Sequence, residues 1–426
     1  MKTIRLFFSA LLALSILGAD AEESVKPPRP PDGLFPDNPS APIIVAAGTA
    51  ASHNVVHVSG AEHTNTAVSC GREFTILLKP DGTVWTCGLV LASPSFPANE
   101  KLVKINGLSD IIAVSAGQSA GLALRSDGTV WAWGFYKPRK IAGLSEITAI
   151  AAGGQHNLAL KSDGTVWAWG KNSFGQLGNG TNEESSDVVQ VTGLTDVTAI
   201  SASVSTSAAL RKDGTVWVWG DRQCMVLDPR KMAAPKSSKD KNDALGIDVA
   251  PAKIANLSNA IAISIGSGFG LALKSNGMVY AWGGPRSELG GNIAKSLGAV
   301  NGKDYGPDTT ASIKYSGPNT AVLVAGLSKV VGISAGQSAA FALKSDGTVW
   351  AWGSEVVTSA PSCNAFTPHV VPDLSDVFFV TASKYDKFQM AVKRDNTIWA
   401  WGLNHGAFGN KTKNLLVRCP VPALLE

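Results

Sequence analysis

The stretch that most constrains the fold is Asp163–Gly170, with the sequence Asp-Gly-Thr-Val-Trp-Ala-Trp-Gly. Related eight-residue stretches begin at Asp81, Asp127, Asp213, Asn276, Asp346 and Asp395, which makes seven copies. All 12 tryptophans of the chain lie inside these copies. A motif that holds every Trp builds the core, so the repeats predict an architecture before they predict a function.

One clear repeat unit has the pattern of three antiparallel strands, predicted at residues 147–151, 158–160 and 166–169. The first strand alternates with period two. Asp163-Gly164 predicts a tight hairpin, because both residues tolerate positive φ. Trp167 and Trp169 share one face of the third strand, and the smaller apolar residues beside them share the other. Both faces are apolar, so we expect each sheet to have a neighbour on both sides.

A Gly-Leu-Ser-Asp-like lead-in opens the units, and one unit ends in a complete Asn-Ser-Phe-Gly-Gln-Leu-Gly tail at Asn172–Gly178. The lead-in, the Ala-Ala-Gly break, Leu-Ala-Leu-Lys, the Trp motif and this tail together resemble the repeat of the regulator-of-chromosome-condensation family. The resemblance covers about residues 54–426. It implies an all-β fold, a seven-bladed β-propeller of four-stranded blades. The repeat length by itself indicates a propeller or a β-solenoid.

The ends of the repeat region set how the ring closes. We expect the segment around Val417–Leu424 to supply the last outer strand of the seventh blade. Val55–Val58 then remains as a spare strand that could latch the seam, because an open ring would leave two exposed sheet edges.

The chain is predicted to have three parts: a secretory signal peptide at 1–21, a Pro-rich linker at 22–52 and the propeller at 53–426. The signal peptide has basic residues, then a short apolar run, then a small-x-small cleavage site. The sequence therefore predicts an exported protein, periplasmic or extracellular. Two insertions interrupt the repeats at about 221–250 and 284–320.

The formal charge is +4 and falls to +3 once the signal peptide is removed. A nearly neutral chain of this length argues against a nucleic-acid-binding surface. We expect no membrane span after signal removal, and a monomer. The sequence holds no recognisable catalytic, cofactor-binding or metal-binding motif, so we expect no enzyme, no cofactor and no metal.

Several residues that suggest chemistry have simpler explanations. The hairpin Asp residues would line one rim, but a basic residue precedes each at one or two positions, so the charges should roughly cancel and the Asp residues should serve the turn. His53 and His57 lie too far apart on a strand to share a zinc ion, and His63 does not complete a site. His156 takes the place of Ser119, Ser338 or Phe269 in sister units, and the resemblance implies a hydrogen bond to backbone inside its blade.

Five cysteines occur, at Cys70, Cys87, Cys224, Cys363 and Cys419. Cys70 and Cys87 are expected two strands apart, about 9.5 Å, which is too far for a disulfide. A Cys363–Cys419 bond between neighbouring blades stays open.

The sequence predicts a non-catalytic propeller that binds another protein through one rim and the two insertions, since long loops on a rigid scaffold usually carry function. The candidate contact residues are Arg230, Lys231, Lys236, Lys239, Tyr305 and Tyr315. The resemblance implies two relatives to compare: nuclear nucleotide-exchange factors that bind chromatin and a small GTPase, and secreted propellers that inhibit β-lactamases. The alternatives are a guanine-nucleotide-exchange-type regulator and an enzyme that acts on saccharides at the central channel.

Overall fold

The computed structural model describes residues 67–88, 99–134, 136–221, 247–283, 321–353, 368–403 and 416–422. The chain divides into two units, Met1–Ala41 and Pro42–Glu426, and every described residue belongs to the second. Within these ranges all regular elements are strands, and none is a helix that could cross a membrane. The predicted signal peptide, the linker and the spare strand at Val55–Val58 lie outside the described residues.

The third sheet shows how the repeat folds. It consists of four consecutive strands, β9 (Ile147–Ala152), β10 (His156–Lys161), β11 (Val166–Gly170) and β12 (Ser185–Gln190). Each strand pairs antiparallel with the next. The β-branched and aromatic residues favour strands, and glycines end them. The three strands predicted at 147–151, 158–160 and 166–169 are confirmed, and a fourth is added.

The other six sheets have the same order, and each is a blade numbered along the chain. Blade 1 holds β1 (Ala67–Cys70), β2 (Phe74–Leu78), β3 (Val84–Gly88) and β4 (Asn99–Lys104). Blade 2 holds β5 (Ile111–Ala116), β6 (Gly121–Arg125), β7 (Val130–Trp133) and β8 (Arg139–Lys140). Blade 4 holds β13 (Val197–Ala202), β14 (Thr206–Arg211), β15 (Val216–Asp221) and β16 (Ile247–Lys253).

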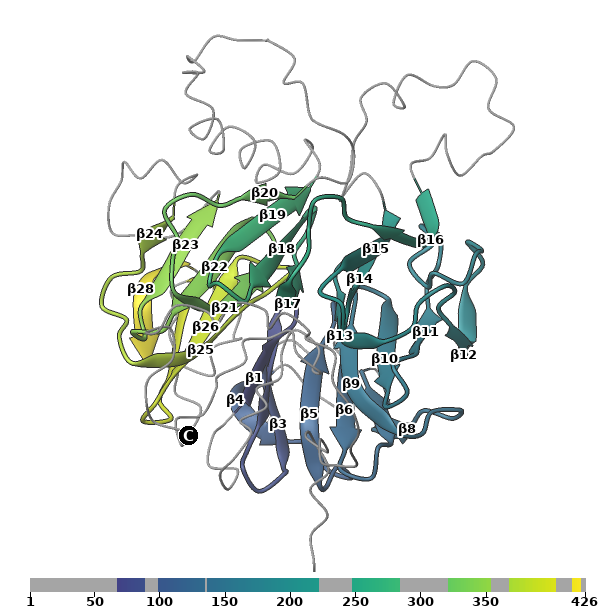
Figure 1. Ribbon diagram of the computed structural model, residues 1–426. Helices are drawn as coiled ribbons and strands as arrows, with labels where there is room; N and C mark the ends of the chain where they lie inside the picture. The colour runs from purple at the N-terminus through teal and green to yellow at the C-terminus, as the bar shows by residue number, and fades with distance from the viewer. Residues whose placement is uncertain are drawn as a thin grey trace, which may run out of the picture. The chain divides into compact units, whose positions relative to one another are not determined.

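Blade 5 holds β17 (Ala260–Ile265), β18 (Phe269–Lys274), β19 (Val279–Gly283) and β20 (Val322–Leu323). Blade 6 holds β21 (Val330–Ala335), β22 (Ala339–Lys344), β23 (Val349–Gly353) and β24 (His369–Val370). Blade 7 holds β25 (Val377–Ala382), β26 (Phe388–Lys393), β27 (Ile398–Leu403) and β28 (Leu416–Pro422). The fold is therefore the predicted seven-bladed propeller of four-stranded blades, and Figure 1 shows most of these strands in place.

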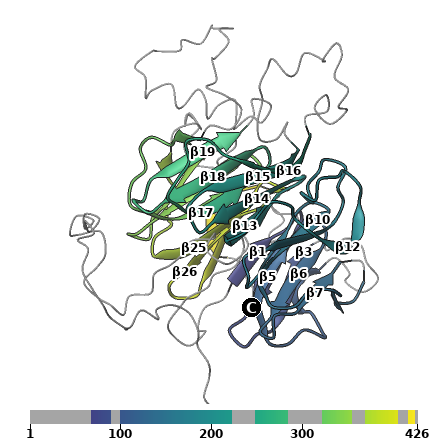
Figure 2. The ribbon, with the colours of Figure 1, turned by 45° about the vertical axis from the view of Figure 1, so that its right-hand side comes forward.

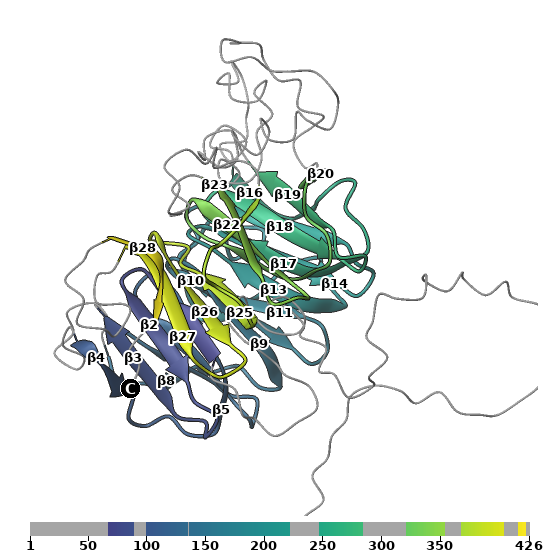
Figure 3. The ribbon, with the colours of Figure 1, turned by 90° about the vertical axis from the view of Figure 1, so that its left-hand side faces the viewer.

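The blades form a closed ring. The first strand of each blade contacts the first strand of the next, as β13 contacts β17 in Figure 2. β1 also contacts β25 and β26, so blade 7 meets blade 1, and Figure 3 shows the yellow strands of blade 7 next to the purple strands of blade 1. β28 is the predicted last outer strand. Among the described residues, each sheet consists of four consecutive strands, and blades 7 and 1 meet through contacts between β1 and β25 and between β1 and β26.

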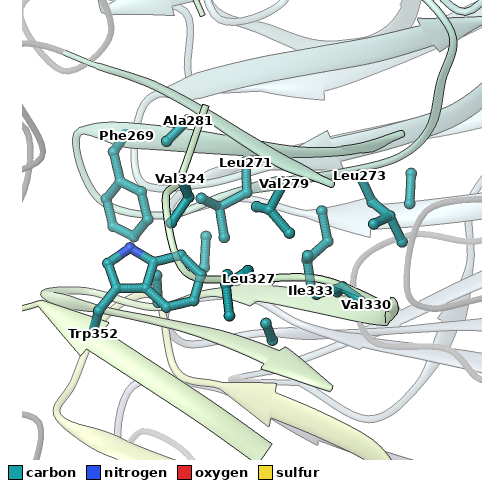
Figure 4. Close-up of a cluster of buried hydrophobic side chains, with 14 residues drawn as sticks. Phe269, Leu271, Leu273, Val279, Ala281, Val324, Leu327, Val330, Ile333 and Trp352 are labelled. Carbon is teal, nitrogen blue, oxygen red and sulfur yellow. The ribbon is translucent and has the colours of Figure 1, made fainter. Parts of the chain in front are cut away.

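Apolar side chains fill the space between neighbouring blades. Between blades 5 and 6, Phe269 and Leu271 of β18 lie against Ile333 of β21 in one cluster, and Trp352 of β23 packs beside Phe269 (Figure 4). Val279 of β19 belongs to the same cluster. A third strand therefore presents its second Trp to the blade before it and its smaller apolar residues to the blade after it. A large side chain buried in this way contributes about 1.5–3 kcal/mol.

The prototype motif follows this rule. Trp169 is buried in the cluster shared with blade 2, while Val166 and Ala168 are buried in the cluster shared with blade 4. The prediction of two buried faces is confirmed for these residues. It is incomplete for Trp167, which is only half-buried, because its ring reaches the solvent near the hairpin.

Candidate functional site

Antiparallel connection places the turns of each blade on two opposite rims. The turn between the second and third strands, residues 162–165 in blade 3, lies at one end of the sheet; we call this end the hairpin rim. The turn between the first and second strands, 153–155, and the segment between the third and fourth, 171–184, lie at the other end, which we call the loop rim. Since β13 begins against the hairpin of blade 3, neighbouring blades share the same orientation.

The hairpin rim is built from repeated turn chemistry. Asp163 Oδ1 accepts hydrogen bonds from Thr165 N at 2.9 Å and from Thr165 Oγ1 at 2.6 Å, and Trp167 Nε1 donates to Thr165 Oγ1 at 3.1 Å. The bond from the Thr165 hydroxyl, followed by the backbone bond, holds the pKa of the Asp163 carboxyl below its usual value. The same pair of bonds recurs at Asp81, Asp127, Asp213, Asp346 and Asp395. These carboxylates serve the turn, as expected.

The φ angles correct one detail of the predicted hairpin. Gly164 has a φ of +80°, whereas Asp163 is not among the residues with positive φ. Instead, Asp196 in the lead-in of the next blade is the non-glycine residue with a left-handed backbone, and its φ is +54°. There Val197 N donates to Gly164 O at 3.1 Å. The Asp-Gly turn therefore joins two blades as well as two strands.

The basic residues beside the hairpins act on the Asp carboxylates through their charge, since Lys161 helps to lower the pKa of the Asp163 carboxyl, and they also make contacts of their own. Lys161 makes its ion pair with Glu146, at 4.0 Å, and its ammonium lies 5.9 Å from the ring centroid of Trp167. Closer stacking of a cation on the first aromatic residue occurs at Lys79–Trp85, Arg125–Trp131, Lys274–Tyr280, Lys344–Trp350 and Lys393–Trp399. A cation over an aromatic face is attracted by the ring, so these residues cover the half-buried Trp and stabilise the blade edge.

The loop rim lacks this regularity. It exposes the apolar side chains of Tyr136 (77%), Phe174 (42%) and Val204 (38%), which come from blades 2, 3 and 4. The long segments 222–246 and 284–320 also start and end on this rim, because they connect third strands to fourth strands. Exposed aromatic and aliphatic residues on a rigid frame are typical of protein-binding surfaces.

The complete tail of blade 3 joins this rim to blade 4. Asn172 is fully buried, donates to Glu183 O at 2.9 Å and accepts from Leu177 N at 2.9 Å. Gln176 O accepts from Trp219 Nε1 at 2.9 Å. In the part of the chain that the structure describes, the corresponding indole nitrogens of four other residues are buried without a partner, namely those of Trp133, Trp282, Trp352 and Trp401. The tail thus satisfies one indole and joins blade 3 to blade 4.

His156 lies at the same junction, with a partner that differs from the predicted one. Its Nε2 is 2.9 Å from Ser207 Oγ in blade 4, and Ser207 Oγ donates to Gln176 O at 2.8 Å. Since the Ser207 proton is used there, His156 Nε2 is the donor. The contact is a side chain of the next blade rather than backbone of its own. Burial, and then the charge of Lys384, lowers the pKa of His156 to about 3. The register also shows that its sister residues are Ala120 and Ala339 rather than Ser119 and Ser338.

Sequence reasoning missed Lys384 and Tyr385, which are buried in the turn between β25 and β26. Lys384 Nζ donates to Ala202 O in blade 4, and Tyr385 OH donates to Ala152 O in blade 3 at 3.5 Å. Burial lowers the pKa of Lys384 to about 7. The sequence could have indicated these residues. The segment between the first and second strands of blade 7, Ser-Lys-Tyr-Asp-Lys-Phe, is longer than the corresponding Gly-Gln-Ser-Ala segment of a sister unit.

Cys70 and Cys87 are free and buried, so the prediction of no disulfide between them is confirmed. Burial raises the pKa of both thiols, that of Cys87 to about 12. The described residues contain no cluster of His, Cys, Asp or Glu that could hold a metal ion.

The remaining predicted residues lie outside the described side chains. They are Arg230, Lys231, Lys236, Lys239, Tyr305, Tyr315, His53, His57, His63, Cys224, Cys363 and Cys419.

Comparisons with known proteins agree with this architecture. The family model described as Regulator of chromosome condensation (RCC1) repeat matches residues 111–135, 147–176, 197–224, 260–287 and 330–356, and a second model of that description matches 163–210. A comparison with curated proteins finds no match.

Two solved structures show the same fold. Prp20p from Saccharomyces cerevisiae, described with its binding to Gsp1p and histones, is 19% identical; the match covers 74% of this chain and 80% of that chain, with a TM-score of 0.57. Human WBSCR16 is 17% identical, with coverage of 80% and 94% and a TM-score of 0.60. At these identities the likeness concerns the fold.

Proposed function

We propose, from the premise that this chain belongs to the regulator of chromosome condensation (RCC1) repeat family, that it is a non-catalytic protein-binding propeller whose contact surface is the loop rim. The observation that carries the proposal is the contrast between the two rims. The hairpin rim repeats one turn from blade to blade, with its carboxylates and cations already engaged within the propeller. On the loop rim the segments between third and fourth strands differ in length from blade to blade, and the most exposed of the large apolar side chains, Tyr136 (77%), lies there, whereas Met278 on the hairpin rim is 38% exposed.

Both long insertions support the same rim. Segment 222–246 joins Asp221 to Ile247, which are paired neighbours on β15 and β16, so 25 residues connect positions that a short turn could connect. Segment 284–320 joins Gly283 to Ala321 within blade 5, which is the neighbour of blade 4. Both segments are longer than a connection between two neighbouring strands requires. Long loops on a rigid fold usually carry function, so we expect these segments to take part in binding. Arg230 and Tyr305 within these segments are of residue types that are enriched at protein interfaces.

Prp20p gives one precedent, since its description includes binding to Gsp1p and histones. We take from it only that a propeller of this fold can present a surface to another protein. The near-neutral charge of this chain favours a protein partner over nucleic acid. The predicted signal peptide favours a partner outside the cytoplasm, and the mature protein should then begin at Glu22, as an N-terminal sequence would show.

Deleting each insertion tests the proposal. Residues 224–244 and 286–318 are replaced separately by a four-residue Gly-Ser linker, which suffices because paired Cα atoms lie about 5 Å apart. Partners are captured from the native envelope or medium with the parent chain and both deletions. We expect at least one deletion to abolish capture while thermal unfolding stays unchanged. If both deletions retain the captured partners, the insertions are not the contact surface.

A further inference from the structure

The turn between the first and second strands of blade 7 is longer than its six sisters. In blade 6, Ala335 pairs with Ala340, which leaves four residues in the turn; in blade 7, Ala382 pairs with Gln389, which leaves six. Four residues are also found in blades 1 to 5, at 71–74, 117–120, 153–156, 203–206 and 266–269. The two additional residues occur in this blade and in none of the other six, so their role must be sought in the contacts that this turn makes.

The longer turn reaches the far side of the ring. Lys384 Nζ donates to Ala202 O at the end of β13, and Tyr385 OH donates to Ala152 O at the end of β9. β9 and β13 belong to blades 3 and 4, and in a closed ring of seven these two blades are the most distant from blade 7. The side chains therefore cross the central channel at the loop rim.

The base of the same turn is fixed to both neighbours of blade 7. Ser383 Oγ donates to Gly71 O of blade 1 at 2.5 Å, and Ser383 O accepts from Gln337 N of blade 6 at 2.9 Å. Within the turn, Asp386 N donates to Ser383 Oγ at 3.0 Å. One short segment thus makes hydrogen bonds to blades 1, 3, 4 and 6.

The chemistry of Lys384 argues against a simple space-filling role. Only 4% of the residue is exposed, and its partner among the described residues is a neutral carbonyl. A buried ammonium costs free energy unless hydrogen bonds compensate it, so an apolar side chain would fill the channel at lower cost. The groups that bear on its charge include His156, which remains neutral above a pKa of about 3.

The seam shows where such a contact is needed. Six of the seven blade junctions are crossed by the chain as it runs from one outer strand to the next inner strand, whereas blades 7 and 1 are not joined in this way. The described polar contacts at the seam include Ser383–Gly71 and Thr75 Oγ1 to Met390 Sδ at 3.8 Å.

We propose that Ser383–Lys387, the cross-brace, holds the seam closed by tying blade 7 across the channel to blades 3 and 4. Lys384 and Tyr385 are the two arms of the cross-brace, and Ser383 is its anchor at the seam. In this role the ammonium is retained for the bond that it makes across the ring. The role is independent of the partner proposed for the loop rim.

Hydrogen–deuterium exchange of the full mature chain tests the cross-brace. The variant Lys384→Met keeps the length and apolar part of the side chain and removes the ammonium. We expect amide exchange in β1 and β25 to increase about tenfold or more, because the seam opens more often, with little change in β17 and β18 of blade 5. Tyr385→Phe, which removes the weaker arm, should raise exchange in the same strands by a smaller factor.

A space-filling role predicts the opposite result. Removing a buried charge would then leave exchange in β1 and β25 unchanged or slower, and the melting temperature would stay the same or rise. Either outcome would overturn the proposal. If Lys384→Met does not fold, Tyr385→Phe carries the test, and exchange rates in β1 and β25 equal to those of the parent would overturn the proposal.

Discussion

Two tryptophans of equal burial should respond differently to the same substitution. Trp219 and Trp352 occupy the second Trp position of their motifs, and each is 1% exposed. The indole nitrogen of Trp219 donates to Gln176 O at 2.9 Å, whereas that of Trp352 is buried without a partner. Replacing each by Phe removes a similar apolar volume, so the packing loss is shared and the hydrogen bond makes the difference.

The difference can be estimated from the two environments. Trp219→Phe loses a hydrogen bond with a net contribution of about 1 kcal/mol. Trp352→Phe removes a buried unsatisfied donor, whose presence costs about 1–3 kcal/mol. Trp219→Phe should therefore reduce the free energy of unfolding by about 2–4 kcal/mol more than Trp352→Phe does. Trp282→Phe is the matched control, because its indole nitrogen is also buried without a partner.

Urea unfolding followed by far-ultraviolet circular dichroism measures this difference as a shift in midpoint at constant slope. We expect the midpoint of Trp219→Phe to be the lowest of the three, with the other two variants close together. Equal midpoints, or a lower midpoint for Trp352→Phe, would refute the idea that the blade 3 tail stabilises the next blade through Trp219.

Three further changes have definite expected outcomes. Gly164→Ala should lower the free energy of unfolding in urea by about 1–2 kcal/mol, because φ is +80° and the new Cβ would lie 3.1 Å from the backbone of Asp196. An unchanged urea midpoint would contradict this expectation. The part of the stability that depends on neutral His156 should be complete above pH 6.5 and should fall by up to about 4 kcal/mol as the pH drops toward 3, since the unfolded chain protonates His156 at about 6.5 and the folded chain only at about 3; His156→Gln should flatten the pH dependence in this range. Cys70 and Cys87 should resist thiol reagents until the chain unfolds, because burial raises the pKa of both thiols; mass spectrometry that finds either one labelled in the folded protein would contradict this.

The regular part of the fold could be predicted from the sequence because it depends on local chemistry that is repeated. The Asp-Gly turn, the period-two strands and the paired Trp residues each indicate one arrangement, and the seven copies agree. Trp169 and Val166 therefore lie where the pattern placed them, on opposite faces between two blades.

The contacts that join distant blades could not be predicted in the same way. The partner of His156 is Ser207, 51 residues away, and that of Lys384 is Ala202, 182 residues away. No local pattern specifies such pairs, because they depend on how the ring closes. The stacking of the hairpin cations on aromatic rings was also missed, although Lys344 of β22 lies over the ring of Trp350 on the adjacent strand β23.

Site-specific photocrosslinking tests most directly whether the loop rim is the binding surface. Val204 lies on the loop rim and Met278 on the hairpin rim, and both are apolar and 38% exposed. A photoreactive residue is placed at each position in turn, and the full mature chain is irradiated with the captured partner. Crosslinks from position 204 and none from position 278 are expected. Crosslinks from position 278 alone would contradict the account.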